Sequence, residues 1–319
     1  MDDLPTRLDF DDLERHSFVA ASGGARLDRF LADQLPDQSR AALKRFIQRG
    51  LVTVNGSPAK ASAKLAAGDA VVVDLPTVLP PRVEPQDLPL RVLWEDPAFV
   101  VIDKAAGIAV HPGRGRPDGT VANAIAHHYG VLDSGGVGEG HRPGIVHRLD
   151  LETSGVMVVA RTDTALAALQ TAFRERTVEK EYRALVHGEP EYDEDEIDLP
   201  LGRDVHHPAL MAVRFDEGRP SQTWVVTEER FAGKAAHVRC HPRTGRTHQI
   251  RVHLQSRGHP LLGDSMYARG RANPVVVPRL MLHARRLVFP HPVTGAPVEV
   301  EAPLPADFDE VLAKLRALD

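Results

Sequence analysis

Apolar and polar positions in the first quarter of the chain predict a small module of two helices and a short sheet. Residues 26–31 have the spacing of a short amphipathic helix, and Ser39 is a favoured N-cap for a second helix that ends near Gln48. The Asn55-Gly56 pair predicts a hairpin, because both residues readily take the positive φ that a two-residue turn needs. Strands are predicted on both sides of this hairpin and after a second turn, at residues 51–54, 57–60 and 70–73.

The rest of the chain predicts a larger domain in which short strands and a few helices follow one another irregularly. Strands are predicted at residues 91–94, 99–103, 178–187, 223–229, 235–240, 287–289 and 298–300. Helices are predicted at residues 163–173, 246–255 and 307–317. Because strands and helices do not alternate regularly, the pattern favours an α+β fold with a mixed, mainly antiparallel sheet.

Composition indicates where these parts begin and end. Residues 1–22 are acidic or small and are predicted to be a flexible tail, so that the small α/β module spans 23–75. Residues 76–90 carry five prolines and are predicted to be a semi-stiff linker to the larger domain at 91–319. The glycine-rich stretch 134–140 lacks the Lys-Ser/Thr ending of a phosphate-binding loop, so we interpret it as a connection.

The net charge of −5 hides an uneven distribution. Residues 1–15 carry six acids and two bases, and residues 189–198 carry seven acids and no base. Without these segments, which contribute −4 and −7, the remaining chain has a net charge of +6. Its bases concentrate at residues 25–64, 239–257 and 269–286. Basic regions of this kind fit a nucleic-acid phosphate backbone, whereas each region taken alone would be an ordinary solvated surface.

Several classes of protein are disfavoured. Cys240 is the single cysteine, which excludes an internal disulfide and fits a reducing cytoplasm. No apolar run approaches the roughly 20 residues that span a bilayer, and the acidic start does not resemble a secretory signal. His248 and His253 are five residues apart, not the four that would place two zinc ligands on one helical face. His237 and His241 near the cysteine lie on a predicted strand and its end, so we expect no metal site.

Three segments could carry chemistry. Asp150 lies next to Arg148, before a polar turn that leads into an apolar strand, although an aspartate in this position is usually a turn former. Tyr182 shares one face of its strand with Lys180, and a packed tyrosine is the common case there. Arg251 lies on a half-buried helix, where a guanidinium needs a carboxylate partner.

The N-terminal module resembles the S4-type RNA-binding domain. The matching residues are Arg26, Leu27, Asp28, Ser39, Arg40, Ile47, Gly50, Val54, Asn55 and Gly56. The resemblance implies that the second helix faces RNA with its basic side chains, Arg40, Lys44, Arg45 and Arg49. The alternative is a small α/β cap with a solvated basic helix.

The larger domain resembles the RluA-type family of pseudouridine synthases over about residues 91–304. The matching segments are His147–Asp150 with Thr153–Gly155, Lys180–Ala184, Gly245–His253, Gly258–Asp264, Leu282–Ala284 and His291-Pro292. The resemblance implies an RNA-modifying isomerase that breaks the glycosidic bond of a uridine, turns the uracil and rejoins it through carbon five. This reaction involves no redox change and no phosphoryl transfer, so it implies no cofactor.

The resemblance also implies roles for individual residues. Asp150 corresponds to the nucleophile, Arg251 to the arginine that pairs with it, and Tyr182 to the tyrosine that stacks on the uracil and helps to remove the proton from carbon five. The target base must be flipped out of its stem, and Arg148 corresponds to the residue that fills the vacated space. Further residues are expected to contact RNA or line the pocket: Arg246, His248 and Leu282.

Two features depart from the family pattern or leave questions open. The usual Lys-Pro-Ala-Gly sequence is Lys104-Ala105-Ala106-Gly107 here, which should keep its glycine turn and lose some stiffness. The acidic stretch 189–198 is expected to project away from RNA.

The expected target is large-subunit ribosomal RNA, acted on by a monomer, with transfer RNA as the alternative. One competing hypothesis is a non-catalytic RNA-binding or assembly factor. Another is a metal-dependent hydrolase, which the spacing of the histidines disfavours.

Overall fold

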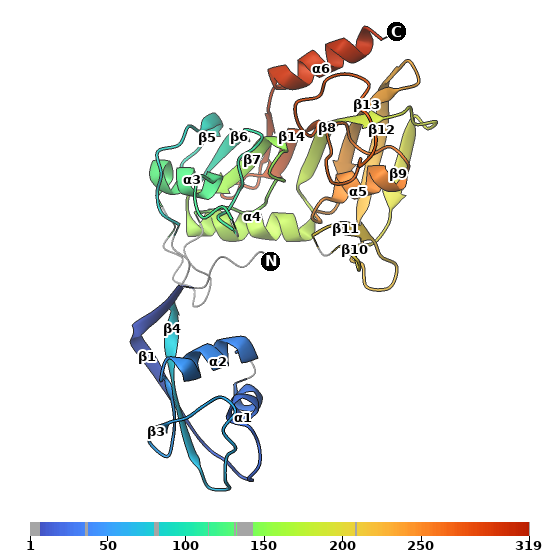
Figure 1. Cartoon of the computed structure of the whole chain (residues 1–319). Helices are drawn as coiled ribbons and strands as arrows, with labels where there is room; N and C mark the ends of the chain where they lie inside the picture. Colours follow the sequence, from blue (N-terminus) through green and yellow to red (C-terminus); the bar gives the residue numbers. More distant parts are fainter. Residues whose placement is uncertain are drawn as a thin grey trace. The chain divides into compact units, whose positions relative to one another are not determined.

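The computed structural model describes residues 7–35, 38–79, 83–113, 115–130, 132, 143–207 and 209–318. The chain divides into two compact units, Pro5–Pro81 and Arg82–Asp319, which we call the N-terminal unit and the catalytic unit (Figure 1). Each is described by itself. The glycine-rich stretch at 134–140 lies outside the described residues.

The N-terminal unit is a four-stranded antiparallel sheet with two helices. The strands follow the order β1-β4-β2-β3. Their bounds and those of the helices are β1 Arg7–Val19, α1 Leu27–Gln34, α2 Arg40–Gln48, β2 Val52–Val54, β3 Ser57–Pro58 and β4 Ala70–Leu79. Leu27 and Leu31 of α1 and Leu43 and Phe46 of α2 bury their side chains against Val71 and other apolar residues of the sheet. This amphipathic packing confirms the two predicted helices.

Local capping and turn chemistry follow the prediction. The Ser39 hydroxyl accepts a hydrogen bond from the backbone N–H of Ala42 at 3.2 Å, as an N-cap does. Asn55 and Gly56 have φ values of 51° and 77°, which is the backbone conformation that joins β2 to β3.

The predicted flexible tail at 1–22 is wrong for residues 7–19, which form β1 and pair with β4. The acidic composition of this segment does not indicate a strand. A strand at the edge of a sheet can still form there, because it needs apolar residues on one face only. Phe18 supplies that face against the core, and Arg15 bonds Asp74 across the pair at 2.7 and 3.0 Å. The predicted linker at 76–90 is likewise wrong for residues 76–79, which continue β4.

The catalytic unit is built on one large mixed sheet. Its strands follow the order β5-β6-β7-β14-β8-β13-β12-β9, and β15 pairs with β14. Their bounds are β5 Arg91–Glu95, β6 Phe99–Lys104, β7 Ser154–Ala160, β8 Glu179–His187, β9 Glu194–Asp198, β12 Gln222–Phe231, β13 Ala235–Pro242, β14 Leu282–Pro290 and β15 Pro297–Glu301. Among the strands described, β7 and β14 are parallel and the other neighbours in this sheet are antiparallel, which confirms the predicted α+β class.

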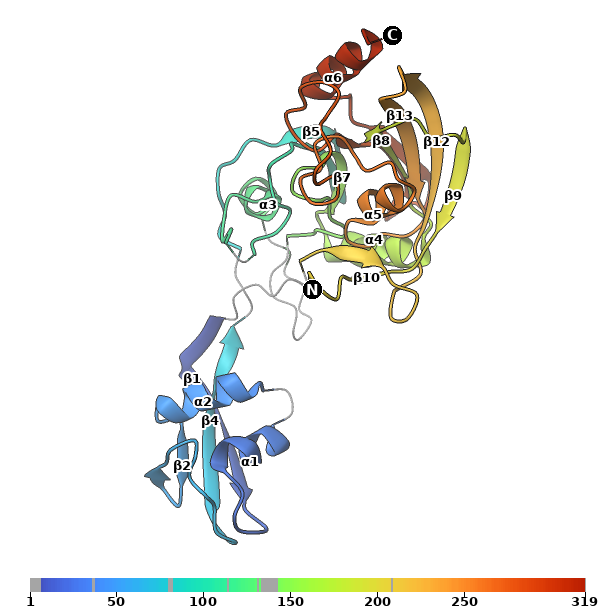
Figure 2. The ribbon, with the colours of Figure 1, turned by 45° about the vertical axis from the view of Figure 1, so that its right-hand side comes forward.

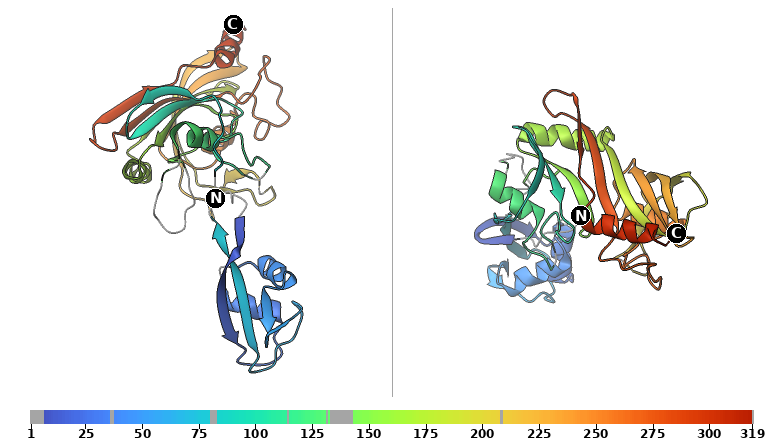
Figure 3. Two further views of the ribbon diagram at one scale, coloured as in Figure 1. Left: turned by 90° about the vertical axis from the view of Figure 1, so that its left-hand side faces the viewer. Right: turned by 90° about the horizontal axis from the view of Figure 1, so that it is seen from above.

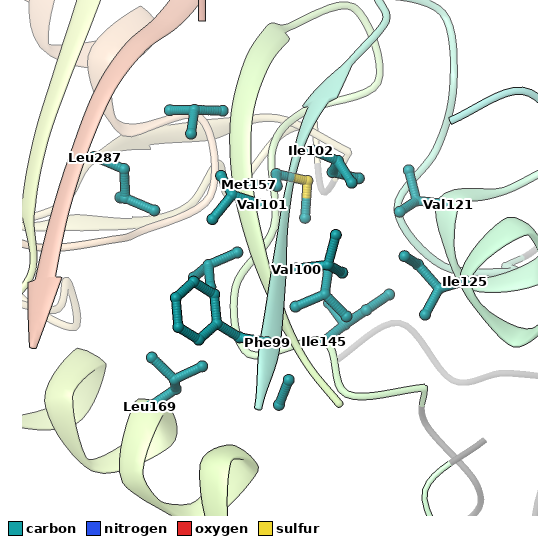
Figure 4. Close-up of a cluster of buried hydrophobic side chains, with 14 of the residues drawn as sticks. Phe99, Val100, Val101, Ile102, Val121, Ile125, Ile145, Met157, Leu169 and Leu287 are labelled. Atoms are coloured by element: carbon teal, nitrogen blue, oxygen red, sulfur yellow. The ribbon is translucent and has the colours of Figure 1, made fainter. Parts of the chain in front are cut away.

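Two helices cover opposite faces of the first half of this sheet. Figure 4 shows Val100 directed towards Val121 and Ile125 of α3 (Val121–Tyr129), whereas Phe99 points to the other side, towards Leu169 of α4 (Asp163–Glu175). These side chains are all buried, so β6 is covered on both faces. Because both faces are covered, the residues of β6 from Phe99 to Ile102 are all apolar.

Two further helices cover the second half. Ile250 and Leu254 of α5 (Gln249–Ser256) pack with Ala184 of β8. The helix lies over the face of the sheet that β8, β12 and β13 form (Figure 2). Phe308 of α6 (Ala306–Arg316) packs with Leu185, whose side chain points to the opposite face because neighbouring side chains alternate along a strand. Figure 3 shows α6, in red, next to the C-terminus.

Some elements differ from the prediction. Helix α5 begins at Gln249 and not at residue 246, because His248 has φ 55° and the Gln249 side-chain oxygen accepts hydrogen bonds from the Thr244 hydroxyl and the Arg246 N–H. These contacts fold residues 244–248 into a turn. The prediction missed helix α3 and strands β9, β10 (Leu201–Arg203) and β11 (Met211–Val213).

The second acidic segment is partly strand β9, which pairs with β12. Its carboxylates bind arginines from other elements, as in the pairs of Asp195 with Arg257 at 2.7 Å and of Asp193 with Arg230 at 2.8 Å. Much of the negative charge is therefore balanced within the catalytic unit.

Candidate active site

Four strands of the large sheet bring the candidate residues together. Tyr182 on β8 is opposite Cys240 on β13 and Ala284 on β14, and Ala284 is opposite Gly155 on β7. Asp150 precedes Gly155 by a short turn, and the segment that leads to Arg251 follows Cys240. The register of the sheet thus explains why three segments far apart in the sequence meet at one place.

The close contact between β7 and β14 requires a glycine. Gly155 has φ 119°, and a Cβ atom at this position would collide with the carbonyl oxygen of Ala284. The Thr-Ser-Gly part of the motif therefore allows the loop that carries Asp150 to lie directly beside the start of β14.

These segments enclose a cleft of about 1250 Å³. Of the residues predicted for the site, those in the catalytic unit all line it: Arg148, Asp150, Tyr182, Arg246, His248, Arg251 and Leu282. Lys180 lines it too, so the alternation predicted for β8 is confirmed. The exception is the group on α2, which belongs to the N-terminal unit.

Asp150 and Arg251 are in contact. The Nη1 group of Arg251 donates a hydrogen bond to Oδ2 of Asp150 at 3.3 Å. The Arg251 side chain is 5% exposed and that of Asp150 is 20% exposed, so the carboxylate is the member of the pair that opens to the cleft. The need of Arg251 for a carboxylate partner, inferred from its half-buried helix, is met here.

Arg251 has a second carboxylate partner, Asp264, that the sequence argument did not single out. Nε and Nη2 of Arg251 donate to the two oxygens of Asp264 at 2.7 and 2.9 Å. Burial alone would raise the pKa of Asp264, but the hydrogen bonds and charge of Arg251 outweigh it and lower this pKa. Removing one member of a buried ion pair lowers the free energy of unfolding by about 3–5 kcal/mol. Asp264 therefore holds the guanidinium of Arg251 firmly in place.

The Tyr182 hydroxyl is held in its protonated form. Burial, and secondarily the negative charge of Asp150, raise the pKa of Tyr182 above its ordinary value. Together with Leu282, its ring supplies an apolar surface in a cleft otherwise rich in charge.

Lys104 holds the loop that carries Asp150. Its Nζ donates to the carbonyl oxygens of Ala105, Ile108 and Leu151 at 2.9, 2.8 and 3.2 Å. Burial lowers the pKa of Lys104 to about 8, against the raising effect of Asp150. Gly107 has φ 83° and its N–H binds the Leu151 carbonyl, which confirms that this loop keeps its glycine turn without the proline.

His147, which opens the Asp150 motif, has a structural role. Its Nε2 accepts a hydrogen bond from the Val158 N–H at 3.0 Å, and its ring stacks on Phe173 of α4. Burial, followed by the charge of Lys180, lowers the pKa of His147 to about 3, so the ring is neutral. It joins the start of the catalytic loop to β7 and α4.

The cleft is strongly cationic. Among the described residues that line it, Asp150 is the one carboxylate. The cationic residues are Arg116, Arg148, Arg174, Arg176, Lys180, Arg243, Arg246 and Arg251. Burial lowers the pKa of Lys180 to about 8. Only three of these arginines were singled out from the sequence. The others lie in a connection or near the ends of helices and strands, where only the fold shows their direction.

Comparison with known proteins identifies the family. The model of the RNA pseudouridylate synthase family matches residues 98–256. An uncharacterized RNA pseudouridine synthase of Synechocystis sp. is 41% identical over 92% of this chain and 90% of its own length. The chain belongs to the RluA-type family of RNA pseudouridine synthases. It is therefore an isomerase that acts on RNA.

Two other relatives of this synthase support the assignment. Ribosomal large subunit pseudouridine synthase D of Neisseria meningitidis is 40% identical over 92% of this chain and 79% of its own length. The solved structure of human RNA pseudouridylate synthase domain containing 1 has a TM-score of 0.56 at 27% identity and covers 73% of the synthase and 96% of the human chain. The human chain therefore shares the fold of the catalytic domain.

The N-terminal unit of the synthase contains an S4 domain, because the S4 family model matches residues 25–71. Its predicted RNA-binding residues on α2, Arg40, Lys44, Arg45 and Arg49, are all exposed. Arg40 and Lys44 lie 3.5 and 3.9 Å from the carboxylate of Asp28, which also binds Arg26 at 3.0 and 3.1 Å. Asp28 therefore collects three cations at the surface of this unit.

No group of three or more histidine, cysteine, aspartate or glutamate residues in the described part of the synthase is arranged to hold a metal ion. Within the same residues, no helix is long and apolar enough to span a membrane.

Proposed function

We propose that this synthase isomerises uridines of large-subunit ribosomal RNA and that Asp150 is its nucleophile. The observation that carries the proposal is the position of Asp150, the one carboxylate among the described residues lining a cationic cleft, in contact with the buried Arg251. A carboxylate can attack a sugar carbon and be expelled again, as in glycoside chemistry.

The proposed steps use these residues as follows. An oxygen of Asp150 attacks C1′ of the ribose while the bond from C1′ to uracil N1 breaks, and the electron pair remains on the uracil. The uracil turns until C5 faces C1′, the new bond to C5 forms, and Asp150 leaves as a carboxylate. The proton on C5 is then lost, and N1 carries a proton in the product.

Tyr182 supports the last step. Its ring packs on the uracil, beside Leu282. Because burial keeps the hydroxyl protonated, Tyr182 acts as a relay, in which its oxygen accepts the C5 proton while its own proton passes to water in the cleft.

RNA binding follows the charge of the cleft. The exposed Arg148 is placed to enter the space left by a flipped uridine, and the arginines of the lining, including Arg246, meet the phosphates. His248 lies beside them at the start of α5. The S4 domain adds a second contact with RNA through α2. We expect the synthase to act as a monomer in the cytoplasm.

The choice of ribosomal RNA is supported by the relative from Neisseria meningitidis, whose name states that substrate, together with the S4 domain. Transfer RNA is the second candidate. A non-catalytic RNA-binding factor is disfavoured because the three residues that the reaction needs, Asp150, Tyr182 and Arg251, line one cleft.

Tritium release from transcripts labelled at carbon five of uridine tests the proposal. We expect release from large-subunit ribosomal RNA and none from a mixture of transfer RNAs, with Asp150→Asn as the inactive control. Release from transfer RNA alone would contradict the substrate assignment. Pseudouridine mapping in ribosomal RNA from cells with and without this gene would then locate the modified positions.

A further inference from the structure

The Arg251 guanidinium makes its shortest contacts with Asp264 and not with the proposed nucleophile. Two of its groups bind both oxygens of Asp264 at 2.7 and 2.9 Å, whereas one group binds Asp150 at 3.3 Å. The Asp264 side chain is fully buried, whereas Asp150 opens to the cleft. Asp264 therefore fixes the guanidinium from behind, and one edge of it remains for Asp150.

The turn that carries Asp264 encloses the guanidinium on a second side. Oδ1 of Asp264 also accepts hydrogen bonds from the backbone N–H groups of Met266 and Tyr267, at 2.9 and 3.0 Å. The Tyr267 ring lies 5.0 Å from the Arg251 guanidinium carbon. The Tyr267 hydroxyl is 2.8 Å from Nδ1 of His248. We call Asp264 and Tyr267 the Arg251 clamp.

The clamp changes what the contact between Arg251 and Asp150 can do. A guanidinium paired with Asp150 alone would be left buried and uncompensated whenever Asp150 turned to the substrate, and an uncompensated buried charge is strongly unfavourable. With Asp264 in place, the charge of Arg251 stays balanced throughout. Asp150 can then leave the 3.3 Å contact and return to it at little cost in free energy.

We propose that Asp264 is a positioning residue that holds Arg251 so that Asp150 can move between the guanidinium and the ribose. The proposal rests on the proposed role of Asp150 as nucleophile. Asp264 touches no reacting atom in it, so its removal should slow the chemical step and leave RNA affinity unchanged.

The first test compares Asp264→Asn with Asp195→Asn. Asp195 binds Arg257 just beyond the other end of α5, so the control removes an arginine–aspartate pair from the same helix. Single-turnover tritium release and the Kd for the same RNA are measured for both, after their circular dichroism spectra have been matched to wild type. We expect Asp264→Asn to react about 100-fold more slowly with an unchanged Kd, as for a misplaced catalytic group. Asp195→Asn should stay within about twofold of wild type.

Two further variants separate positioning from a general structural role. Asp264→Glu keeps the charge but moves the carboxylate by one methylene group, and once its circular dichroism spectrum has been matched to wild type it should also lose most of the rate. If Asp264 acts through Arg251, the double variant Arg251→Lys/Asp264→Asn should react no more slowly than Arg251→Lys alone.

A folded Asp264→Asn or Asp264→Glu enzyme with the wild-type rate would overturn the proposal, as would rate losses that multiply in the double variant. Asp150→Asn in the same assay keeps the two proposals distinct. Activity in Asp150→Asn refutes the nucleophile, whereas an inactive Asp150→Asn with a fully active Asp264→Asn refutes only the clamp.

Discussion

The two units of the synthase contain carboxylate–cation clusters of opposite design. In the N-terminal unit the carboxylate of Asp28 is fully buried, while Arg26, Arg40 and Lys44 around it are 51, 62 and 51% exposed. In the catalytic unit the cation is buried, because Arg251 is 5% exposed, and Asp150 opens to the cleft. The exposed member of each cluster is the one that can meet RNA.

This difference indicates what each cluster does. A buried carboxylate that gathers exposed cations arranges positive charge for phosphates and so contributes affinity. A buried cation that holds a partly exposed carboxylate arranges a reactive group and so contributes turnover. The comparison predicts that changes in the first cluster alter Kd, whereas changes around the second alter the rate of the bound complex.

After loss of Asp150 itself, the largest effect on the rate is expected for Tyr182→Phe. The variant keeps the ring that we propose packs on the uracil and loses the hydroxyl that we propose relays the C5 proton. We expect the single-turnover rate to fall by about 10²- to 10⁴-fold, the usual range for general acid–base catalysis, with Kd unchanged. Tritium release and filter binding measure the two quantities. A wild-type rate would make Tyr182 a packing residue.

A tenfold effect on Kd is expected for Arg40→Ala/Lys44→Ala, which removes two of the exposed cations around Asp28. Removing two phosphate contacts should weaken binding about tenfold and reduce the slope of log Kd against log salt by about 2. The rate at saturating RNA should not change. Arg15→Ala is the control, since Arg15 is an exposed, carboxylate-bound arginine of the same unit that lies on β1 and not on α2. A fall in the saturated rate would contradict the division of roles.

The smallest expected effect is a pH dependence of RNA binding through Lys180. Burial lowers its pKa to about 8, so its positive charge is present below pH 8 and is lost above it. At constant salt the Kd should rise between pH 7 and pH 8.5, by at most about fourfold. Lys180→Arg, which stays charged, should remove this rise. An equal rise in Lys180→Arg would assign it to another group, such as Lys104, which titrates in the same range.

Most of the fold could be predicted from the sequence because local chemistry and tertiary structure agree. Ser39 caps α2, Asn55 and Gly56 form the hairpin turn, and the alternation in β8 directs Tyr182 into the cleft. Strand β1 could not be recognised, because its sequence is rich in acidic residues and its pairing with β4 is a long-range contact.

Within the site, Asp150, Tyr182 and Arg251 could be predicted, whereas the role of Asp264 could not. The Gly263-Asp264 pair is an ordinary turn signal. Its function depends on the irregular turn after α5, which returns the chain to the side of Arg251 that faces away from the cleft. The spacing of apolar and polar residues in the sequence does not indicate that this turn brings Asp264 to Arg251.

Single-turnover tritium release by Asp150→Asn at saturating enzyme tests whether Asp150 carries the chemistry. Asparagine keeps the size of the side chain and an oxygen for Arg251 but cannot act as a nucleophilic carboxylate. We predict that the variant binds large-subunit ribosomal RNA with the wild-type Kd and releases no tritium. Release at a rate near that of the wild-type synthase would contradict the account.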